Sequence, residues 1–168
     1  MAHDFSAFVR RRGAHHLRTA VLLTGDWHAA EDLLQSCLVK LYKAWPRLDT
    51  ATDPDAYLRR TLVNTHRSWW RVSWRRETPS DALPDLRARP DDPALALAVR
   101  QALEILPPRQ RLALVLRYFE DLPEAQVAEL MGCSVGSVKT HTHRGVRRLR
   151  EVLGAELIPD DDEVEARR

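Results

Sequence analysis

Apolar residues recur at every third or fourth position over most of this 168-residue chain, and this spacing limits its fold more than any other feature. Such spacing places apolar side chains on one face of an α-helix, whereas a strand requires strict alternation. Strand alternation is absent, and no Asn-Gly or Asp-Gly pair indicates a hairpin. The sequence therefore predicts an all-α protein. The most regular stripe consists of Ala30, Leu33, Leu34, Cys37, Leu38, Leu41 and Trp45.

Capping residues and prolines predict where the helices begin and end. In the first half, Asp26 caps a helix that Pro46 stops, and Asp53-Pro54 opens the next one. In the second half, Gly132 and Ser134 mark a tight turn between two helices. The expected helices cover 5–24, 27–45, 55–75, 93–106, 109–119, 124–131 and 135–153.

Residues 77–92 contain three Pro and five acidic residues with little apolar content, which is typical of a linker. We therefore expect two small helical domains joined by a flexible acidic linker. The first domain covers 1–76, the linker 77–92 and the second domain 93–154. An acidic tail at 155–168 completes the chain.

The formal net charge of +2 conceals two strongly basic segments. Residues 57–76 carry six Arg and no acid, and residues 134–150 carry five basic side chains and no acid. A solvated helix face usually mixes charges of both signs, whereas an unmixed basic block is typical of contact with nucleic-acid phosphates. The distribution of charge, unlike its total, therefore favours nucleic-acid binding.

The segment from Pro123 to Leu149 follows the plan of a helix-turn-helix. A short helix, a glycine turn and a longer basic helix follow one another, and the small Ala128 stands where two helices must approach closely. The second helix of such a motif enters the DNA major groove. The side chains expected at base edges are Lys139, Thr140, His143 and Arg144, with Arg147, Arg148 and Arg150 facing phosphates or solvent.

Aromatic residues alternate with arginines between Tyr57 and Arg76, a pattern that suits single-stranded DNA because bases stack on aromatic faces while Arg binds phosphate. Trp69 shares a helix face with Leu58 and Leu62, so we expect it in the core. For Trp70 and Trp74 the pattern leaves core packing and base stacking open.

No catalytic or cofactor motif stands out. The seven His lack Asp, Glu or Cys partners at metal-binding spacing, and Cys37 and Cys133 are isolated. Phosphate-binding glycine loops are absent too. We therefore expect no enzyme activity, no metal and no cofactor. No apolar run approaches the roughly 20 residues of a membrane span, and the N-terminus lacks the plan of a signal peptide, which predicts a cytoplasmic protein.

These segments, in this order, resemble the extracytoplasmic-function (ECF) sigma factors of the sigma-70 family. Residues 23–26 and 30–35 resemble region 2.1–2.2, and residues 57–71 resemble region 2.3–2.4. Residues 106–111 resemble the start of region 4.1, and residues 127–139 resemble region 4.2. The resemblance implies a three-helix region 2 domain and a helix-turn-helix region 4 domain.

The resemblance also implies partners and roles. Asp32, Leu33, Gln35 and Leu38 are expected to bind core RNA polymerase. Asn64 is expected to capture a flipped base of the −10 element, in a helix that holds promoter DNA with Arg59, Arg60, Arg67, Trp70 and Arg71. Lys139, Thr140, His143, Arg144 and Arg147 are expected at the −35 element. The linker would follow the RNA exit path, and exposed faces on both halves would suit an anti-sigma factor.

Some positions depart from the family pattern. Ser36 stands where an acid is usual, Tyr57 replaces a common Trp and Thr142 replaces an aliphatic residue. His141 replaces a usual Arg. The −35 preference of relatives therefore does not transfer to this chain.

Two other classes of function are alternatives to a sigma factor. A stand-alone helix-turn-helix regulator would act as a dimer, but the first half offers neither a receiver nor a ligand-sensing pattern. A nuclease would require a constellation of carboxylates or histidines, and the sequence offers none.

Overall fold

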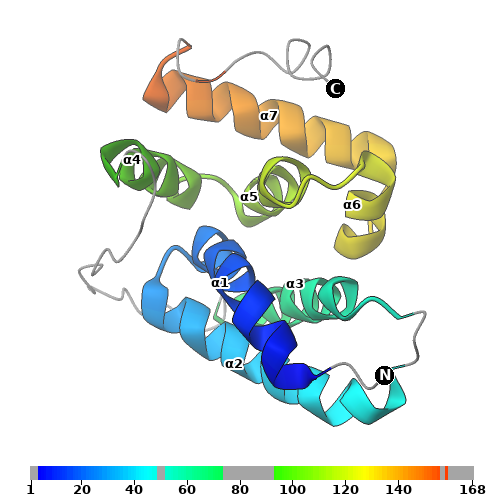
Figure 1. Cartoon of the computed structure of the whole chain (residues 1–168). Coiled ribbons are helices and arrows are strands. Elements are labelled where there is room, and N and C mark those ends of the chain that lie inside the picture. The colour runs from blue at the N-terminus through cyan, green and yellow to red at the C-terminus, as the bar shows by residue number, and fades with distance from the viewer. Residues whose placement is uncertain (1–3, 49–51, 74–92, 156–157, 159–168) are drawn as a thin grey trace. The chain divides into compact units, whose positions relative to one another are not determined.

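The structure is a computed structural model that describes residues 4–48, 52–73, 93–155 and 158. All regular elements within these residues are helical, and the chain divides into two compact units, Met1–Asp85 and Leu86–Arg168. The division falls within the expected linker 77–92, which itself lies outside the described residues, as does nearly all of the expected acidic tail. Figure 1 shows the helices of both units in chain order.

Unit 1 packs three long helices against one another. Asp4 caps the first by accepting a hydrogen bond from the Ser6 amide, and Asp26 caps the second by accepting one from the Ala29 amide at 2.8 Å. Between them Gly25 adopts φ 74°, a left-handed conformation that glycine tolerates best. The elements are α1 (Phe5–Thr24), α2 (Trp27–Ala44), the 3₁₀ turn η1 (Trp45–Arg47) and α3 (Pro54–Ser73).

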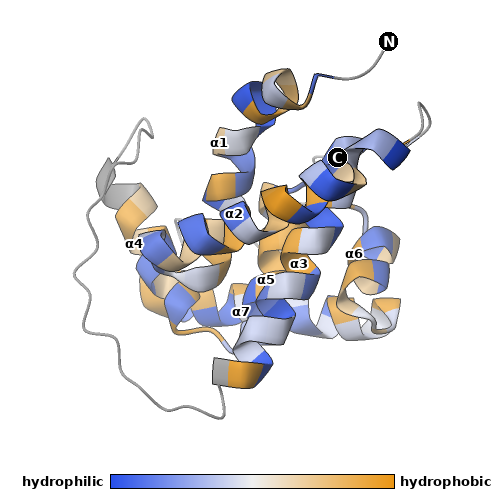
Figure 2. Ribbon diagram, turned by 90° about the horizontal axis from the view of Figure 1, so that it is seen from below, coloured by the Kyte–Doolittle hydropathy of each residue, from blue (hydrophilic) through white to orange (hydrophobic). Residues whose placement is uncertain are grey.

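Much of the core of unit 1 comes from the predicted apolar faces, and Leu23 and Val63 add to it. Leucines from all three helices are almost completely buried, as the 3–4 spacing requires. Figure 2 shows hydrophobic and hydrophilic residues interleaved within the helices. The fully buried side chains include Leu23, Leu33, Leu41, Leu58, Leu62 and Val63.

The expectation that Trp69 lies in this core is wrong. Trp69 is 38% exposed, as is Trp70, although Leu58 and Leu62 on the same helix are fully buried. The last buried side chain of α3 within the described part is Thr65, which accepts a hydrogen bond from Lys40 of α2. Trp69 lies one turn beyond that contact. Trp74 lies outside the described residues.

Unit 2 places three shorter helical segments against one long helix. Gly132 adopts φ 63° in the turn, and the Ser134 side chain accepts a hydrogen bond from the Ser137 amide, so the predicted turn and cap are both present. The elements are α4 (Pro93–Glu104), α5 (Pro108–Leu114), the π-helical turn η2 (Val115–Phe119), α6 (Glu124–Met131) and α7 (Val135–Leu153).

The expected helix 109–119 is present, but it ends in a wider turn. The Glu120 amide donates to the Val115 carbonyl, five residues back, which defines a π-helical turn. Within this turn the buried Arg117 donates to the Leu122 carbonyl at 2.6 Å. A buried backbone carbonyl near the start of α6 is thereby satisfied.

Candidate nucleic-acid and polymerase interfaces

Helix α7 presents the predicted −35 residues on one exposed face. A second set, spaced three or four residues apart on the opposite face, is buried: Val138, Thr142, Gly145, Val146 and Leu149. The helix is therefore held by its apolar side, and its basic side remains accessible. The exposed residues are Lys139, Thr140, His143, Arg144 and Arg147.

Lys139 and Arg147 each lie close to an acidic side chain of unit 2. Lys139 lies 3.6 Å from Glu124 at the start of α6, and Arg147 lies 3.9 Å from Glu151 one turn along α7. The members of the second pair are about two-thirds exposed, so this ion pair contributes little to stability. Both side chains can exchange these partners for DNA phosphates at low cost.

A glycine that the sequence reasoning overlooked fixes the position of α7. A Cβ added at Gly145 would lie 2.8 Å from Leu114 Cδ1 and 3.1 Å from Leu114 Cγ on α5. Real Cβ atoms do not approach so closely, so any other residue at this position would require Leu114 to move. A glycine in the middle of a predicted helix was the available signal, because glycine is costly there unless packing requires it.

In helix α3 the predicted −10 residues divide into two groups. Asn64, Arg60, Trp70 and Arg71 are exposed, and Arg67 is half-buried. Arg59 differs, because it is 16% exposed and its guanidinium lies 3.1 Å from Asp55 one turn earlier. Its side chain forms a contact within unit 1, and its expected role at the −10 element stays a prediction.

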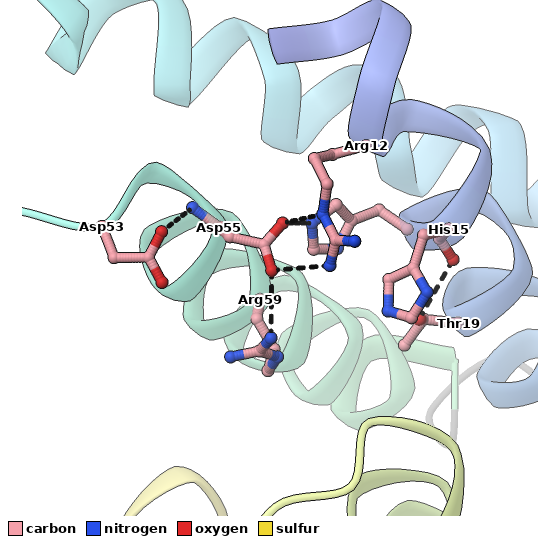
Figure 3. Close-up of polar contacts among 7 residues, drawn as sticks. Arg12, His15, Thr19, Asp53, Asp55 and Arg59 are labelled. Carbon is pink, nitrogen blue, oxygen red and sulfur yellow. Dashed lines mark hydrogen bonds and ion pairs between the residues drawn. The ribbon is translucent and has the colours of Figure 1, made fainter.

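Asp55 is the centre of the network that holds Arg59. Arg12 of α1 donates to both carboxylate oxygens, at 2.7 and 2.8 Å, and the fully buried His16 donates through Nε2 at 2.8 Å. Figure 3 shows these contacts joining the first turn of α3 to the middle of α1. Two positively charged side chains from different helices thus share one carboxylate with a buried imidazole.

The pKa of Asp55 reflects this environment. Burial by itself raises the pKa of the carboxyl, but the hydrogen bonds and charges of Arg12 and His16 outweigh burial and hold the pKa well below its usual range. The sequence indicated Asp55 only as the first turn of a helix. Its partners lie about 40 residues away, a pairing that local patterns do not predict.

The predicted polymerase contacts on α2 also need a correction. Asp32 and Gln35 are exposed and Leu38 is half-buried. Leu33 is 0% exposed and belongs to the core, because the regular apolar stripe turns it toward α1 and α3. The exposed face instead continues along the helix through Val39 and Tyr42, which are 53% and 64% exposed.

Within the described ranges, no group of three or more His, Cys, Asp or Glu side chains is arranged to hold a metal ion. None of the helices described combines the length and the apolar character needed to cross a membrane.

Family models match both units. The model for Sigma-70 region 2 matches residues 6–76, and the model for Sigma-70, region 4 matches residues 96–149. A helical unit with a polar α2 surface, followed by a helix-turn-helix unit with a basic recognition helix, defines a two-part DNA-binding transcription protein.

Relatives are similar along nearly the whole chain. The RNA polymerase sigma-E factor of Streptomyces avermitilis is 40% identical over 161 residues, which cover 91% of this chain and 89% of that protein. The protein of the same name from Streptomyces coelicolor is 38% identical, covering 90% and 87%. The sigma factor RpoE from Bartonella quintana, solved in complex with the anti-sigma factor NepR, is similar in structure, with a TM-score of 0.73, 25% identity and coverage of 89% and 96%.

The chain belongs to the sigma-70 family, as an RNA polymerase sigma factor of the ECF type. It binds core RNA polymerase, recognises the −10 and −35 promoter elements and directs transcription initiation. Sigma factors are regulatory subunits, and RNA polymerase is the enzyme. The alternative of a stand-alone dimeric regulator is not favoured, because both family regions are present in order.

Proposed function

We propose that helix α7 reads the −35 element through Lys139, Thr140, His143 and Arg144, with Arg147 on a neighbouring phosphate. The observation that supports this most directly is the division of α7 into a buried apolar face and an exposed basic face. Base edges in the major groove are reached by such a face, and an arginine pairs best with guanine.

Substituting Arg144 tests this assignment. With the purified chain and core RNA polymerase on promoters varied through the −35 element, Arg144→Ala costs about 1–3 kcal/mol and relaxes discrimination at one base pair. A uniform loss across all −35 variants would instead assign Arg144 to a phosphate. Arg148→Ala, which removes an exposed charge from the same helix, is the matched control.

For the −10 element we propose that Asn64 captures an unpaired base, and that Arg60, Arg67, Trp70 and Arg71 hold the surrounding DNA. Asn64 is exposed, and Trp70, which lies between one and two turns further along α3, is exposed as well, which supports this proposal. Asn64→Ala should impair formation of the open complex while binding to core polymerase is kept. An unchanged rate of promoter opening, measured with permanganate on the melted strand, would refute the role of Asn64.

For core RNA polymerase we propose a docking surface formed by Asp32, Gln35 and Leu38 on α2. The three side chains lie on one accessible side of the helix, away from the buried leucines. Asp32→Arg should reduce assembly with core polymerase, measured by co-elution, and leave the helical content of the chain unchanged. Full assembly of the variant would remove α2 from the interface.

We further propose that the chain supplies specificity and no catalytic chemistry, and that it acts in the cytoplasm, where RNA polymerase and promoter DNA meet. An anti-sigma partner is also proposed, supported by the similarity to RpoE, which was solved with the anti-sigma factor NepR. Exposed apolar side chains such as Val39 and Tyr42 would suit such a partner. Copurification from the native host should yield a protein that blocks transcription in the reconstituted assay.

A further inference from the structure

One flank of α7 comes next to the beginning of α5. The close contact of Gly145 with Leu114 also brings Gln110 within 3.6 Å of a Cβ added at Gly145. The backbones of α5 and α7 are therefore nearest where α5 has just begun. Arg109, the residue before Gln110, consequently lies beside the α7 turn that carries His141 and Arg144.

Three basic side chains from two elements meet there. Arg109 and Arg144 are exposed, and His141 is half-buried. Burial lowers the pKa of His141, and the positive charges of Arg109 and Arg144 lower it further. Among the described residues, none of the three forms an ion pair or a hydrogen bond through its side chain.

The acids and bases of the neighbouring elements are engaged elsewhere. Glu124 at the start of α6 pairs with Lys139 at 3.6 Å. Arg100 and Glu104 of α4 lie 3.7 Å from each other, and Arg111 of α5 donates to backbone carbonyls at the end of α4. Within the described part of unit 2, the cluster of Arg109, His141 and Arg144 therefore carries excess positive charge that no carboxylate pairs with, an arrangement that an external anion relieves.

We propose that Arg109 and His141 bind a phosphate of the DNA backbone next to the base pair that Arg144 contacts, and that His141 does so in its protonated form. The proposal rests on the proposed role of α7 at the −35 element. Neither residue is in the set that the resemblance assigns to the −35 element. His141 stands where the family usually has an arginine, which would carry its charge at every physiological pH.

Because the proposed complex takes up a proton, the proposal predicts how DNA affinity changes with pH. In the free protein the pKa of His141 lies below its ordinary value, so the ring is neutral at neutral pH. A phosphate favours the charged ring and raises this pKa in the complex. Affinity for DNA should therefore fall as the pH rises through the interval between the two pKa values, and should be independent of pH outside it.

The test uses holoenzyme assembled from the full chain and core RNA polymerase, on a promoter fragment with both elements. Arg109→Ala should weaken binding by roughly 3- to 10-fold on all −35 sequences alike, and should lower the slope of affinity against salt by about 1. His141→Gln should remove most of the difference in affinity between about pH 6 and about pH 8, and His141→Arg should give tight binding at both.

Two controls isolate the cluster. Arg148→Ala removes an exposed charge from α7 and should keep the wild-type pH dependence. His143→Gln removes the other imidazole of the exposed face. A pH dependence that survives in His141→Gln but disappears in His143→Gln would overturn the proposal.

Failure of this inference is distinguishable from failure of the proposed function. If wild-type holoenzyme shows no −35 preference, or Arg144→Ala leaves that preference intact, the role of α7 is wrong. If Arg144→Ala relaxes specificity while Arg109→Ala and His141→Gln leave affinity, salt slope and pH dependence unchanged, only the phosphate site is refuted.

Discussion

The two basic helices, α3 and α7, are held in place by different kinds of interaction. The first turn of α3 is tied to α1 through a carboxylate, Asp55, that gathers Arg12, His16 and Arg59. α7 is instead positioned by apolar packing against α5, at the close approach between Gly145 and Leu114.

This difference determines how much of the positive charge of each helix is available to DNA. In α3 one arginine of the basic block, Arg59, forms an ion pair with Asp55 inside unit 1, so its charge is partly neutralised there. In α7 the close contact that fixes the helix on α5 is apolar, and Arg144, Arg147 and Arg148 remain exposed. A count of arginines therefore overstates the DNA-binding surface of unit 1 more than that of unit 2.

The largest effect is expected from Asp55→Ala. Removing the carboxylate takes away an acceptor that three side chains share, one of them fully buried, and should destabilise unit 1 by about 3 kcal/mol. Urea denaturation followed by tryptophan fluorescence measures unit 1 selectively, because all five Trp lie between residues 27 and 74. The control is Asp53→Ala, which removes only a hydrogen bond to the Asp55 amide and should cost about 1 kcal/mol. Equal losses would show that the network is not the anchor.

The corresponding change in unit 2 is Gly145→Val. A branched side chain at this contact must displace Leu114, so the cost should be about 2 kcal/mol. Far-UV circular dichroism should report the loss, and the tryptophan transition of unit 1 should not move. Gly136→Ala is the matched control on the same helix, because a Cβ there would lie 3.9 Å from its nearest neighbour. That variant should be neutral or slightly stabilising.

Low pH should weaken the Asp55 network of unit 1 but not the apolar contact between Gly145 and Leu114 in unit 2. The pKa of Asp55 is depressed in the folded chain, so its contribution is fully present above its unfolded pKa and is lost as the pH falls toward the folded value. With an unfolded pKa of about 3.9, this amounts to about 1 kcal/mol between pH 5 and pH 3. Asp55→Asn should abolish that part of the acid sensitivity of the tryptophan transition. An unchanged acid profile would mean that another group controls it.

The smallest effects compare neighbouring arginines of α3. Arg60→Ala, at an exposed position, should weaken promoter binding by about 0.5–1 kcal/mol at moderate salt and leave stability unchanged. Arg59→Ala should do the reverse, lowering the stability of unit 1 with little effect on the salt dependence of binding. Promoter-binding titrations at two salt concentrations, paired with urea denaturation, measure both. Identical behaviour of the two variants would contradict the division of charge proposed for α3.

Local patterns were sufficient for most of the fold. The boundaries of α1, α2, α6 and α7 follow from residues next to them, such as the Asp26 and Ser134 caps and the Gly132 turn. Capping and helical periodicity act over a few residues, so a single sequence contains them completely. The same holds for the exposed set on α7, whose members are spaced to share one face.

The predictions of burial were wrong at positions where contacts between distant parts of the chain determine exposure. Trp69 has the periodicity of a core residue but lies past the last buried position of α3, and Leu33 has the periodicity that buries it fully, although family resemblance had assigned it to a partner. Periodicity tells which residues share a face, and only the position of the neighbouring helices tells how far along that face burial extends.

By itself, the sequence determined the helical elements, the two basic segments and the family to which the chain belongs. Only the tertiary structure decided which charged side chains interact with one another inside the protein. Asp55 contacts Arg12 and His16, and the charge of Arg109 lowers the pKa of His141, across separations in the chain that local patterns cannot predict. Electrostatic interactions depend on distance in space, and that distance is set by the packing of whole helices.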